Sequence, residues 1–295
     1  MHHYRRIGVT VKSDIPEKDA VVEQVLKILR KTGAEICIDR ERVRGITSAK
    51  GLKAFHDADD IDLLLILGGD GTILRTVREM DCFSVPILSV NRGNIGFLAE
   101  MSVSEAPRLL PKFLNGEGIL DERSVLRVIA RRKAKTIIDG FVLNEAVISQ
   151  GTIARLIDLK TTVNGEPLTT YRADGLILAT PTGSTAYTLA AGGPILHPQV
   201  QATILTPINS YSFSQKPIVI PADHQVDVEV LGRGNKFGGV DVSLTLDGQV
   251  YVALHSGDII SATVHSHTIK FLRRKKETYY TTLRSKLKWG ERPED

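Results

Sequence analysis

The stretch Leu63-Leu64-Leu65-Ile66-Leu67-Gly68-Gly69-Asp70-Gly71-Thr72 joins five apolar residues to a glycine-rich loop that carries one carboxylate. An uninterrupted apolar run of this length is typical of a strand in a parallel sheet that helices cover on both faces. Residues 73–80 show a helical pattern, so the stretch predicts a strand, a loop and a helix in succession. In such sheets, ligands bind at the loops that follow the carboxyl ends of the strands.

Strands and helices alternate on both sides of this stretch. Apolar runs at residues 6–11, 35–38 and 85–90 predict further strands of the same sheet. The periodic apolar positions of residues 17–32 predict a helix, and a weaker pattern predicts another over residues 52–58. We therefore expect an α/β domain with a parallel sheet over residues 1–118.

The pattern changes after about Leu120. Short, partly alternating apolar runs follow, and pairs of them enclose the dipeptides Asn164-Gly165 and Asp247-Gly248. Each dipeptide in that setting is a strong signal for a β-hairpin. The spacing predicts a mostly antiparallel β-sandwich over residues 119–268. The last segment, with Tyr279, Tyr280, Leu283 and Leu287, returns to a helical pattern, and we expect residues 269–295 to pack on the first domain.

Composition narrows the classes of function. The 295 residues carry a net charge of +4, which suits small anionic substrates but is low for a nucleic-acid-binding protein. No run approaches the roughly 20 apolar residues that a membrane-spanning helix needs. Two isolated cysteines, Cys37 and Cys82, are typical of a reduced cytoplasmic protein. We expect a cytoplasmic protein that binds neither nucleic acid nor a membrane.

Asp70 is the unusual residue of the glycine-rich loop. Glycines let phosphates approach the backbone closely, and the start of the next helix offers unpaired N–H groups and a positive dipole end. A carboxylate there repels phosphates unless it binds a metal or accepts a proton. The alternative is a tight turn in which Asp and Gly supply unusual backbone angles. The loop alone leaves both interpretations open.

Three further segments carry polar residues suited to nucleotides. Residues 91–98 hold glycines, amides and a guanidinium that can bind phosphate. The pair Asn144-Glu145 interrupts an apolar run and suits ribose hydroxyls, although a buried structural network explains it nearly as well. Residues 180–187 crowd hydroxyls, Pro and Gly into one turn. There we expect Ser184 to cap a helix through Leu189 and the turn to hold a polar nucleotide group.

Together these segments resemble the NAD kinase family. The resemblance covers nearly the whole chain, in the family's order and approximate spacing. It rests on residues 68–72, 91–98, 144–145, 172 with 174, 180–187, 192–194 and 247–249. The first loop alone also fits the diacylglycerol- and sphingosine-type lipid kinases and the 6-phosphofructokinases. The resemblance implies a phosphofructokinase-like or Rossmann-like first domain before the β-sandwich.

An NAD kinase transfers the γ-phosphate of ATP to the 2′-hydroxyl of the adenosine ribose of NAD, which gives NADP and ADP. The resemblance implies that Asp70 takes the proton of that hydroxyl. It places the following residues at the nucleotides: Gly68, Gly69, Gly71, Thr72, Arg75, Asn94, Asn144, Glu145, Arg155, Arg172, Asp174, Thr182, Ser184, Thr185, Ala186, Tyr187, Thr188, Leu189, Ala190 and Gln249. Asn144 and Glu145 would hold the adenine and ribose groups, and Asp174 would meet the nicotinamide end. Arg155 departs from many bacterial relatives, which carry another polar residue, such as His, at this position.

The resemblance also implies cofactors and partners. Magnesium would arrive with ATP, since no cluster of carboxylates suggests a metal site built by the protein. The chain would form a homodimer or homotetramer in which a neighbouring β-domain completes each site. Two other functions stay open: a kinase for a lipid or sugar hydroxyl, and a dinucleotide sensor without catalysis. A lipid acceptor needs an apolar cavity that no run suits, and a sensor has no need of Asp70.

Overall fold

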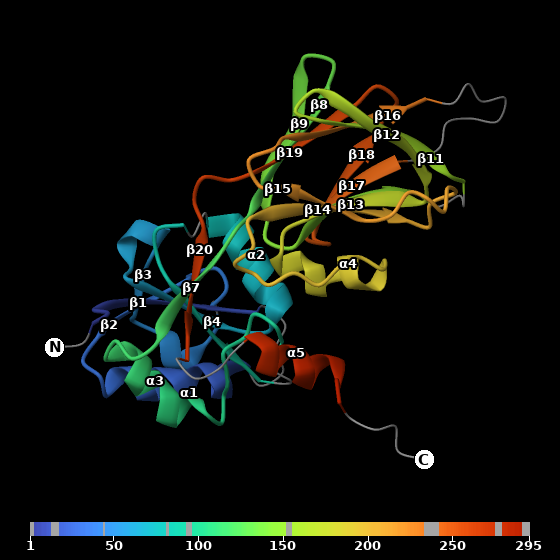
Figure 1. The fold of residues 1–295 in the computed structure, drawn as a ribbon. Helices are drawn as coiled ribbons and strands as arrows, with labels where there is room; N and C mark the ends of the chain where they lie inside the picture. The colour runs from blue at the N-terminus through green and yellow to red at the C-terminus, as the bar shows by residue number, and fades with distance from the viewer. Residues whose placement is uncertain are drawn as a thin grey trace. The chain divides into compact units, whose positions relative to one another are not determined.

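The computed structural model of the chain describes residues 3–12, 18–43, 45–80, 83–92, 96–151, 155–232, 242–274 and 279–290. The chain forms two compact units, each with sheets of its own (Figure 1). Unit 1 combines Met1–Glu122 with Ile269–Asp295, and unit 2 is Arg123–Thr268. The chain therefore leaves unit 1 once and returns to it once.

Unit 1 is built around an eight-stranded sheet with the order β3-β2-β1-β4-β5-β20-β7, while β6 pairs with β5 off this path. Its strands are β1 (Arg6–Val11), β2 (Glu35–Ile38), β3 (Lys53–Ala54), β4 (Leu63–Leu67), β5 (Ile87–Asn91), β6 (Met101–Ser102), β7 (Ile119–Arg123) and β20 (Ile269–Arg273). The pairs β1–β2, β2–β3, β1–β4, β4–β5, β5–β6 and β5–β20 are all parallel. The sheet is mostly parallel, as predicted, and the apolar run forms its middle strand.

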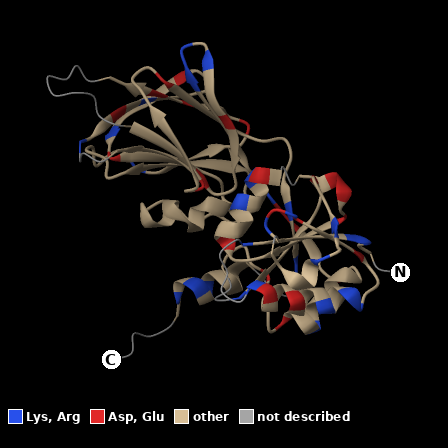
Figure 2. Ribbon diagram, turned by 180° about the vertical axis from the view of Figure 1, so that it is seen from behind, with Lys and Arg blue, Asp and Glu red and all other residues tan. Residues whose placement is uncertain are grey.

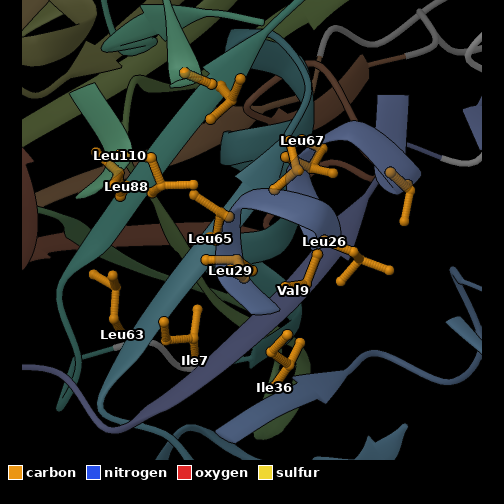
Figure 3. Close-up of a cluster of buried hydrophobic side chains, with 14 of the residues drawn as sticks. Ile7, Val9, Leu26, Leu29, Ile36, Leu63, Leu65, Leu67, Leu88 and Leu110 are labelled. Atoms are coloured by element: carbon orange, nitrogen blue, oxygen red, sulfur yellow. The ribbon is translucent and has the colours of Figure 1, made fainter. Parts of the chain in front are cut away.

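The residues of β4 are fully buried because both faces of the sheet are covered. Leu63, Leu65 and Leu67 pack in one cluster with helices α1 (Lys18–Arg30) and α3 (Ala106–Leu114), as Figure 3 shows. Leu64 and Ile66 alternate with them and are equally buried. Burial of each large apolar side chain contributes roughly 1.5–3 kcal/mol, so β4 is a firm support for the loop that follows it.

Helix α2 (Asp70–Met80) starts inside the glycine-rich loop, and α5 (Tyr279–Leu287) is the last described helix. The helix predicted over residues 52–58 is wrong. That part of the chain forms β3 and the 3₁₀ helix η2 (Ala58–Asp60), after a first 3₁₀ helix, η1 (Thr47–Ala49). Pairing of β3 with the edge of β2 outweighs the weak helical pattern. In the described ranges, no helix is long and apolar enough to cross a membrane.

Unit 2 consists of two six-stranded sheets with the orders β15-β14-β13-β10-β17-β18 and β12-β11-β16-β19-β8-β9. The first contains β10 (Glu145–Gln150), β13 (Gly175–Ala179), β14 (Ala202–Ile208), β15 (Ile218–Pro221), β17 (Val242–Leu246) and β18 (Val250–Leu254). The second contains β8 (Leu126–Arg132), β9 (Lys135–Val142), β11 (Ile157–Val163), β12 (Glu166–Ala173), β16 (Val226–Leu231) and β19 (Ile259–Val264). Apolar residues of both sheets share one core. The predicted antiparallel β-domain is confirmed.

Both predicted hairpins are present. Asn164 and Gly165 join β11 to β12 with φ angles of 50° and 81°, and Asp247 and Gly248 join β17 to β18 with 49° and 64°. Two successive positive φ angles are the signature of a type I′ turn, which Asn-Gly and Asp-Gly favour. Unlike Asn164, Asp247 is buried. Its side chain therefore has a role inside the unit as well as in the turn.

Candidate active site

Asp70 is the first residue of α2 and lies just beyond the carboxyl end of β4. The helix begins in the loop itself, since the N–H of Thr72 donates to the carbonyl of Gly69 (2.9 Å). None of residues 68–72 has a positive φ. A turn that requires unusual backbone angles therefore does not account for this loop, and that interpretation of Asp70 is wrong.

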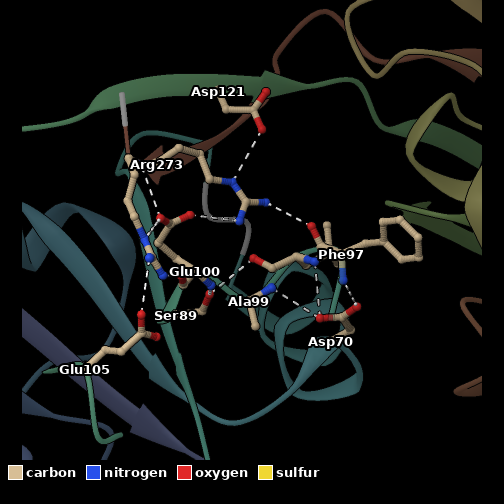
Figure 4. Close-up of polar contacts among 10 residues, drawn as sticks. Asp70, Ser89, Phe97, Ala99, Glu100, Glu105, Asp121 and Arg273 are labelled. Carbon is tan, nitrogen blue, oxygen red and sulfur yellow. Dashed lines mark hydrogen bonds and ion pairs between the residues drawn. The ribbon is translucent and has the colours of Figure 1, made fainter. Parts of the chain in front are cut away.

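The Asp70 carboxylate binds three consecutive backbone N–H groups of the loop after β5 (Figure 4). Phe97 donates to Oδ2 (2.8 Å), while Leu98 and Ala99 both donate to Oδ1 (3.2 Å each). An ionised carboxylate offers about four lone-pair positions. Oδ2 therefore keeps one acceptor position for a further donor, such as a hydroxyl.

Gly96 leaves room for the carboxylate of Asp70, because it has no side chain. A Cβ atom on Gly96 would lie 2.1–2.3 Å from the carboxylate atoms of Asp70, a distance that no side chain tolerates. With any larger residue at this position, the Asp70 carboxylate would have to move from the place where it binds the three N–H groups.

Arg273 of β20 holds the same loop from its other side. Its guanidinium donates to the carbonyl of Phe97 (3.3 Å) and to Oε2 of Glu100 (3.2 Å), and it lies 3.5 Å from a carboxylate oxygen of Asp121 (Figure 4). Glu100 is buried, which raises the pKa of its carboxyl although Arg273 and Arg274 oppose that effect. The segment that binds Asp70 is thus fixed between α2 and β20.

A cavity of about 200 Å³ opens beside the glycine-rich loop. It is lined by Val11, Lys12, Arg42, Gly69, Gly71, Thr72 and Arg75. Arg42 and Arg75 both bind the carboxylate of Glu79, so the two guanidinium groups are held in place. Three cations, two glycines and the start of a helix are groups that suit the binding of phosphate.

Sequence reasoning missed Lys12 and Arg42. A signal existed for Lys12, because it directly follows β1, which is the parallel neighbour of β4, and the carboxyl ends of both strands meet at one edge of the sheet. Arg42 lies beyond β2 in a segment without a motif. Figure 2 shows Lys and Arg interspersed with Asp and Glu over unit 1. The three cations at this loop are therefore a local feature rather than part of a basic face.

In unit 2, the pair Asn144-Glu145 lies where β10 begins, and two neighbours hold it. The Asp247 carboxylate accepts hydrogen bonds from the backbone N–H groups of Leu143, Asn144 and Glu145 at 2.9, 2.9 and 3.0 Å. On the other side, Thr180 donates its N–H to the carbonyl of Asn144 (2.9 Å) and its hydroxyl to that of Leu143 (2.6 Å). The backbone of the pair is fully bonded, which leaves its side chains for other partners.

Glu145 is the most perturbed acid of this region. Burial raises its pKa, and the neighbouring charge of Asp247 raises it further, against one backbone hydrogen bond from Tyr187, so that the pKa is about 7. Its Oε2 is buried and has no hydrogen-bond partner among the described residues. A buried acceptor of this kind is suited to a ligand hydroxyl.

The hydroxyl-rich segment after β13 differs from the predicted helix. Thr182–Thr185 forms the 3₁₀ helix η3, and a single short helix, α4 (Tyr187–Ala190), follows it. Ser184 does not cap a helix: its fully buried hydroxyl donates to the carbonyl of Pro181 (2.6 Å) and accepts from the N–H of Leu196 (3.0 Å). These bonds fold the turn back on the chain and shorten the helix. Tyr187 is half-exposed, so its ring is accessible to a ligand.

Asp174 and Arg172 lie elsewhere in unit 2. Arg172 lies near the end of β12, and Asp174 directly precedes β13, whereas Thr180 follows the other end of β13. The five residues of β13, which separate Asp174 from Thr180, span about 17 Å. Asp174 accepts hydrogen bonds from Gln150 (2.9 Å) and Asn209 (3.0 Å). Arg172 stacks on Tyr211, with 5.3 Å from its guanidinium carbon to the ring centre.

Three further positions complete the placement of the predicted set. Arg155 is exposed before β11, Gln249 is exposed at the hairpin after Asp247, and Asn94 lies outside the described residues. In the part of the chain that the structure describes, no group of three His, Cys, Asp or Glu side chains could hold a metal ion.

Two family models match the chain. The ATP-NAD kinase N-terminal domain matches residues 7–118, and the ATP-NAD kinase C-terminal domain matches residues 143–274. Among similar proteins, the NAD kinase of Citrifermentans bemidjiense is 38% identical over 98% of this chain and 100% of its own. The NAD kinase of Syntrophobacter fumaroxidans is 39% identical over 97% of this chain and 99% of its own.

Solved structures share the fold. The crystal structure of an NAD kinase from Archaeoglobus fulgidus in complex with ATP matches with a TM-score of 0.74 and 25% identity, over 96% of this chain and 98% of that one. The crystal structure of yeast NADH kinase complexed with NADH matches with a TM-score of 0.86 and 24% identity, over 99% of this chain and 90% of that one. At this identity the match shows a shared fold alone. Because family models match both parts of the chain and relatives match almost all of it, the chain belongs to the NAD kinase family.

Proposed function

We propose that the protein is an NAD kinase that transfers the γ-phosphate of ATP to the 2′-hydroxyl of the adenosine ribose of NAD and releases NADP and ADP. The observation that carries this proposal is the Asp70 loop: a carboxylate with one free acceptor position lies in the loop that also lines a cationic cavity. Membership of the NAD kinase family also supports NAD as the acceptor, since the relatives carry the name NAD kinase.

In the proposed reaction, the residues of unit 1 act on the phosphates and on the acceptor hydroxyl. Lys12, Arg42 and Arg75 bind phosphate oxygens of ATP, which enters with Mg²⁺ as the Mg–ATP complex. Phosphoryl transfer passes through a loose transition state in which alignment and charge neutralisation dominate. Asp70 therefore aligns the 2′-hydroxyl through Oδ2 and receives its proton late.

We propose that unit 2 binds the dinucleotide. The free acceptor atom of Glu145 and the amide of Asn144 hold the adenine and ribose groups, and the exposed face of α4 with Tyr187 forms the wall beside them. Asp174 and Arg172 meet the nicotinamide end. The hydroxyls of Ser184 and Thr188 are fully buried, so their contribution is to the shape of this wall.

A purified preparation supplied with NAD, ATP and Mg²⁺ is expected to form NADP, detected with an NADP-specific dehydrogenase. Reactions without ATP or without Mg²⁺ are the controls, and polyphosphate is tested as the donor in a third. The resemblance implies a preference for NAD over NADH, because family members with Arg at the position of Arg172 favour the oxidised form, so turnover with NADH is expected to be poor. Tight binding of NAD by calorimetry with no NADP formed would establish a sensor and refute the kinase.

We also propose that the chain assembles as a homodimer or homotetramer, with the β-domain of a neighbour completing each site. Three aromatic side chains of unit 2 support this, because Tyr211, Phe213 and Tyr251 are 75, 88 and 67% exposed. The separation of Asp174 from Asn144 along β13 supports it as well, since a neighbour's Asp174 can serve a site that its own chain does not reach. Light scattering at micromolar concentration is expected to give two or four subunits. A fully active monomer would contradict the proposal.

We further propose a cytoplasmic location. Cys37 is a buried free thiol, whereas Cys82 lies outside the described residues. Burial raises the pKa of the Cys37 thiol, so it stays protonated and inert. A thiol of this kind is typical of a reducing compartment. Fractionation of cells that express the tagged protein tests the location.

A further inference from the structure

One peptide group of the loop after β5 is bonded at both of its ends (Figure 4). Its N–H, which belongs to Leu98, donates to Oδ1 of Asp70 (3.2 Å). Its carbonyl, which belongs to Phe97, accepts from the guanidinium of Arg273 (3.3 Å). The carboxylate thus lies at the positive end of the peptide dipole and the cation at its negative end. A cation at the carbonyl polarises the peptide group, so the N–H becomes a stronger donor to the carboxylate.

The next peptide group is bonded in the same way, by a neutral side chain. The N–H of Ala99 donates to Oδ1 of Asp70 (3.2 Å), and the carbonyl of Leu98 accepts from the hydroxyl of Ser89 (3.2 Å). This hydroxyl is buried and accepts in turn from the N–H of Glu100 (3.0 Å). Oδ1 is therefore the anchored oxygen of Asp70. Among the described residues, Oδ2 accepts a single N–H, which leaves it able to meet a substrate hydroxyl.

Three further contacts fix the guanidinium of Arg273 where it meets the loop. It donates to Oε2 of Glu100 (3.2 Å) and lies 3.5 Å from a carboxylate oxygen of Asp121. It also lies over the ring of Phe271, with 5.3 Å from the guanidinium carbon to the ring centre. Because its side chain is 13% exposed, solvent screens its charge little. A guanidinium held in this way loses little freedom when it binds a carbonyl.

We propose that Arg273 is a positioning residue for phosphoryl transfer, which acts through the peptide group of Phe97 and Leu98 to hold Asp70 with Oδ2 towards the acceptor hydroxyl. The inference rests on the proposed function, because it takes Asp70 as the group that receives the proton of that hydroxyl. The role requires no contact between Arg273 and the nucleotides. Its removal lets the carboxylate shift, and a misplacement of about 1 Å in a reacting group can cost about 10²-fold in rate.

The first comparison removes the guanidinium and keeps a side chain of similar length. Arg273→Met takes the cation from the carbonyl of Phe97, while Glu100 keeps Arg274 as a partner (2.9 Å). In assays of NADP formation we expect kcat to fall about 10- to 100-fold, a part of the contribution of a general base. The KM for NAD is expected to change little, because unit 2 is proposed to bind the dinucleotide. Arg273→Lys keeps the charge without the planar fork and is expected to lower kcat by less.

Arg132→Met is the matched control in unit 2. Arg132 also pairs with a buried carboxylate, that of Asp258 (2.8 Å), and also donates to a backbone carbonyl, that of Ala253 (3.1 Å). It belongs to no part of the proposed site. We expect both Met variants to have lower melting temperatures, and Arg132→Met to keep the kcat of the wild-type protein. An equal kcat in the two variants overturns the inference.

The second comparison asks whether Arg273 acts through Asp70. Arg273→Met is combined with Asp70→Asn, which already lacks the proton acceptor. Losses from residues that act as a unit overlap, whereas independent losses multiply. We therefore expect the double variant to have nearly the same kcat as Asp70→Asn alone. Full multiplication of the two losses would show that Arg273 acts elsewhere and would overturn the inference.

The double variant Glu100→Gln/Arg273→Met separates turnover from stability. Removal of both charges of the buried pair avoids a poorly compensated carboxylate, so the melting temperature is expected to recover in part. The kcat is expected to stay low, because the carbonyl of Phe97 still lacks its donor. Recovery of kcat together with the melting temperature would establish a structural role and overturn the inference. If Arg273→Met does not fold, this double variant and Arg273→Lys carry the test.

A wild-type protein that forms no NADP refutes the proposed function instead. In that case the coupling between Arg273 and Asp70 is measured in the free energy of unfolding, with urea as the denaturant. Overlapping losses of stability in Asp70→Asn and Arg273→Met support the action of Arg273 on Asp70, and losses that simply add overturn it.

Discussion

Replacement of Asp70 by Asn is expected to reduce NADP formation by about 10²–10⁴-fold, the usual contribution of a general base. The amide has almost the same size but cannot take the proton of the ribose hydroxyl. It also keeps only one acceptor oxygen for the N–H groups of Phe97, Leu98 and Ala99, and its NH₂ group opposes at least one of them. A loss of stability of about 1–3 kcal/mol is therefore expected beside the loss of turnover.

The variant Asp62→Asn is the control that separates the loss of turnover in Asp70→Asn from its loss of stability. Asp62 precedes β4, at the opposite end of the strand from Asp70, and accepts the backbone N–H groups of Arg5 (3.1 Å) and Arg6 (2.9 Å). Its replacement is expected to lower the melting temperature by a similar amount with turnover retained. Turnover and melting temperature are measured for both variants. Near-normal NADP formation by Asp70→Asn would end the proposal of a general base.

Replacement of Gly183 by Ala is expected to disrupt the proposed dinucleotide site of unit 2. A Cβ atom at Gly183 would lie 2.2 Å from the carbonyl oxygen of Asn144 and 2.6 Å from its carbonyl carbon. Both are backbone atoms, so the strain is not relieved by rotation of a side chain. Overpacking of this kind costs about 1–3 kcal/mol or more, and here the displaced atoms belong to the Asn144-Glu145 turn. We expect a lower melting temperature and a large rise in the dissociation constant of NAD.

Gly140→Ala is the matched control in the same unit. A Cβ atom there would meet only the terminal Cδ1 atom of Leu246, at 3.1 Å, which can move aside. Calorimetry with NAD and thermal melting are expected to show a small effect for Gly140→Ala and a large one for Gly183→Ala. Equal binding of NAD by the two variants would show that the contact between Gly183 and Asn144 has no part in binding.

Elements with strong local signals were predictable from the sequence. The apolar run of β4 and the dipeptides of the two hairpins specify their own conformations, because buried strands and type I′ turns each depend on a few adjacent residues. The succession of such elements then indicated an α/β part and an antiparallel part. The position of Asp70 at the carboxyl end of a parallel strand followed from the same run.

Elements that depend on distant partners were not predictable. Strand β3 exists because β2 offers it an edge, and Ser184 bonds to Leu196 instead of capping a helix. The contact of Arg273 with Glu100 joins residues 173 positions apart, and no local pattern indicates it. The three N–H groups bound to Asp247 are likewise a product of strand pairing, which places residue 247 beside residue 145.

The place of β20 in the sheet of unit 1 has a consequence for biosynthesis. β20 lies between β5 and β7, yet the ribosome makes all of unit 2 between β7 and β20. At about 5–20 residues per second, the emerging chain waits on the order of ten seconds with the part of β5 around Ile87 unpaired on that edge, where Phe271 of β20 later pairs. Glu100 meanwhile lacks Arg273 and Arg274, so its carboxylate favours a hydrated, open arrangement. The contacts of Arg273 with Phe97 and Glu100, which hold the loop that binds Asp70, therefore form only after all of unit 2 has been synthesised.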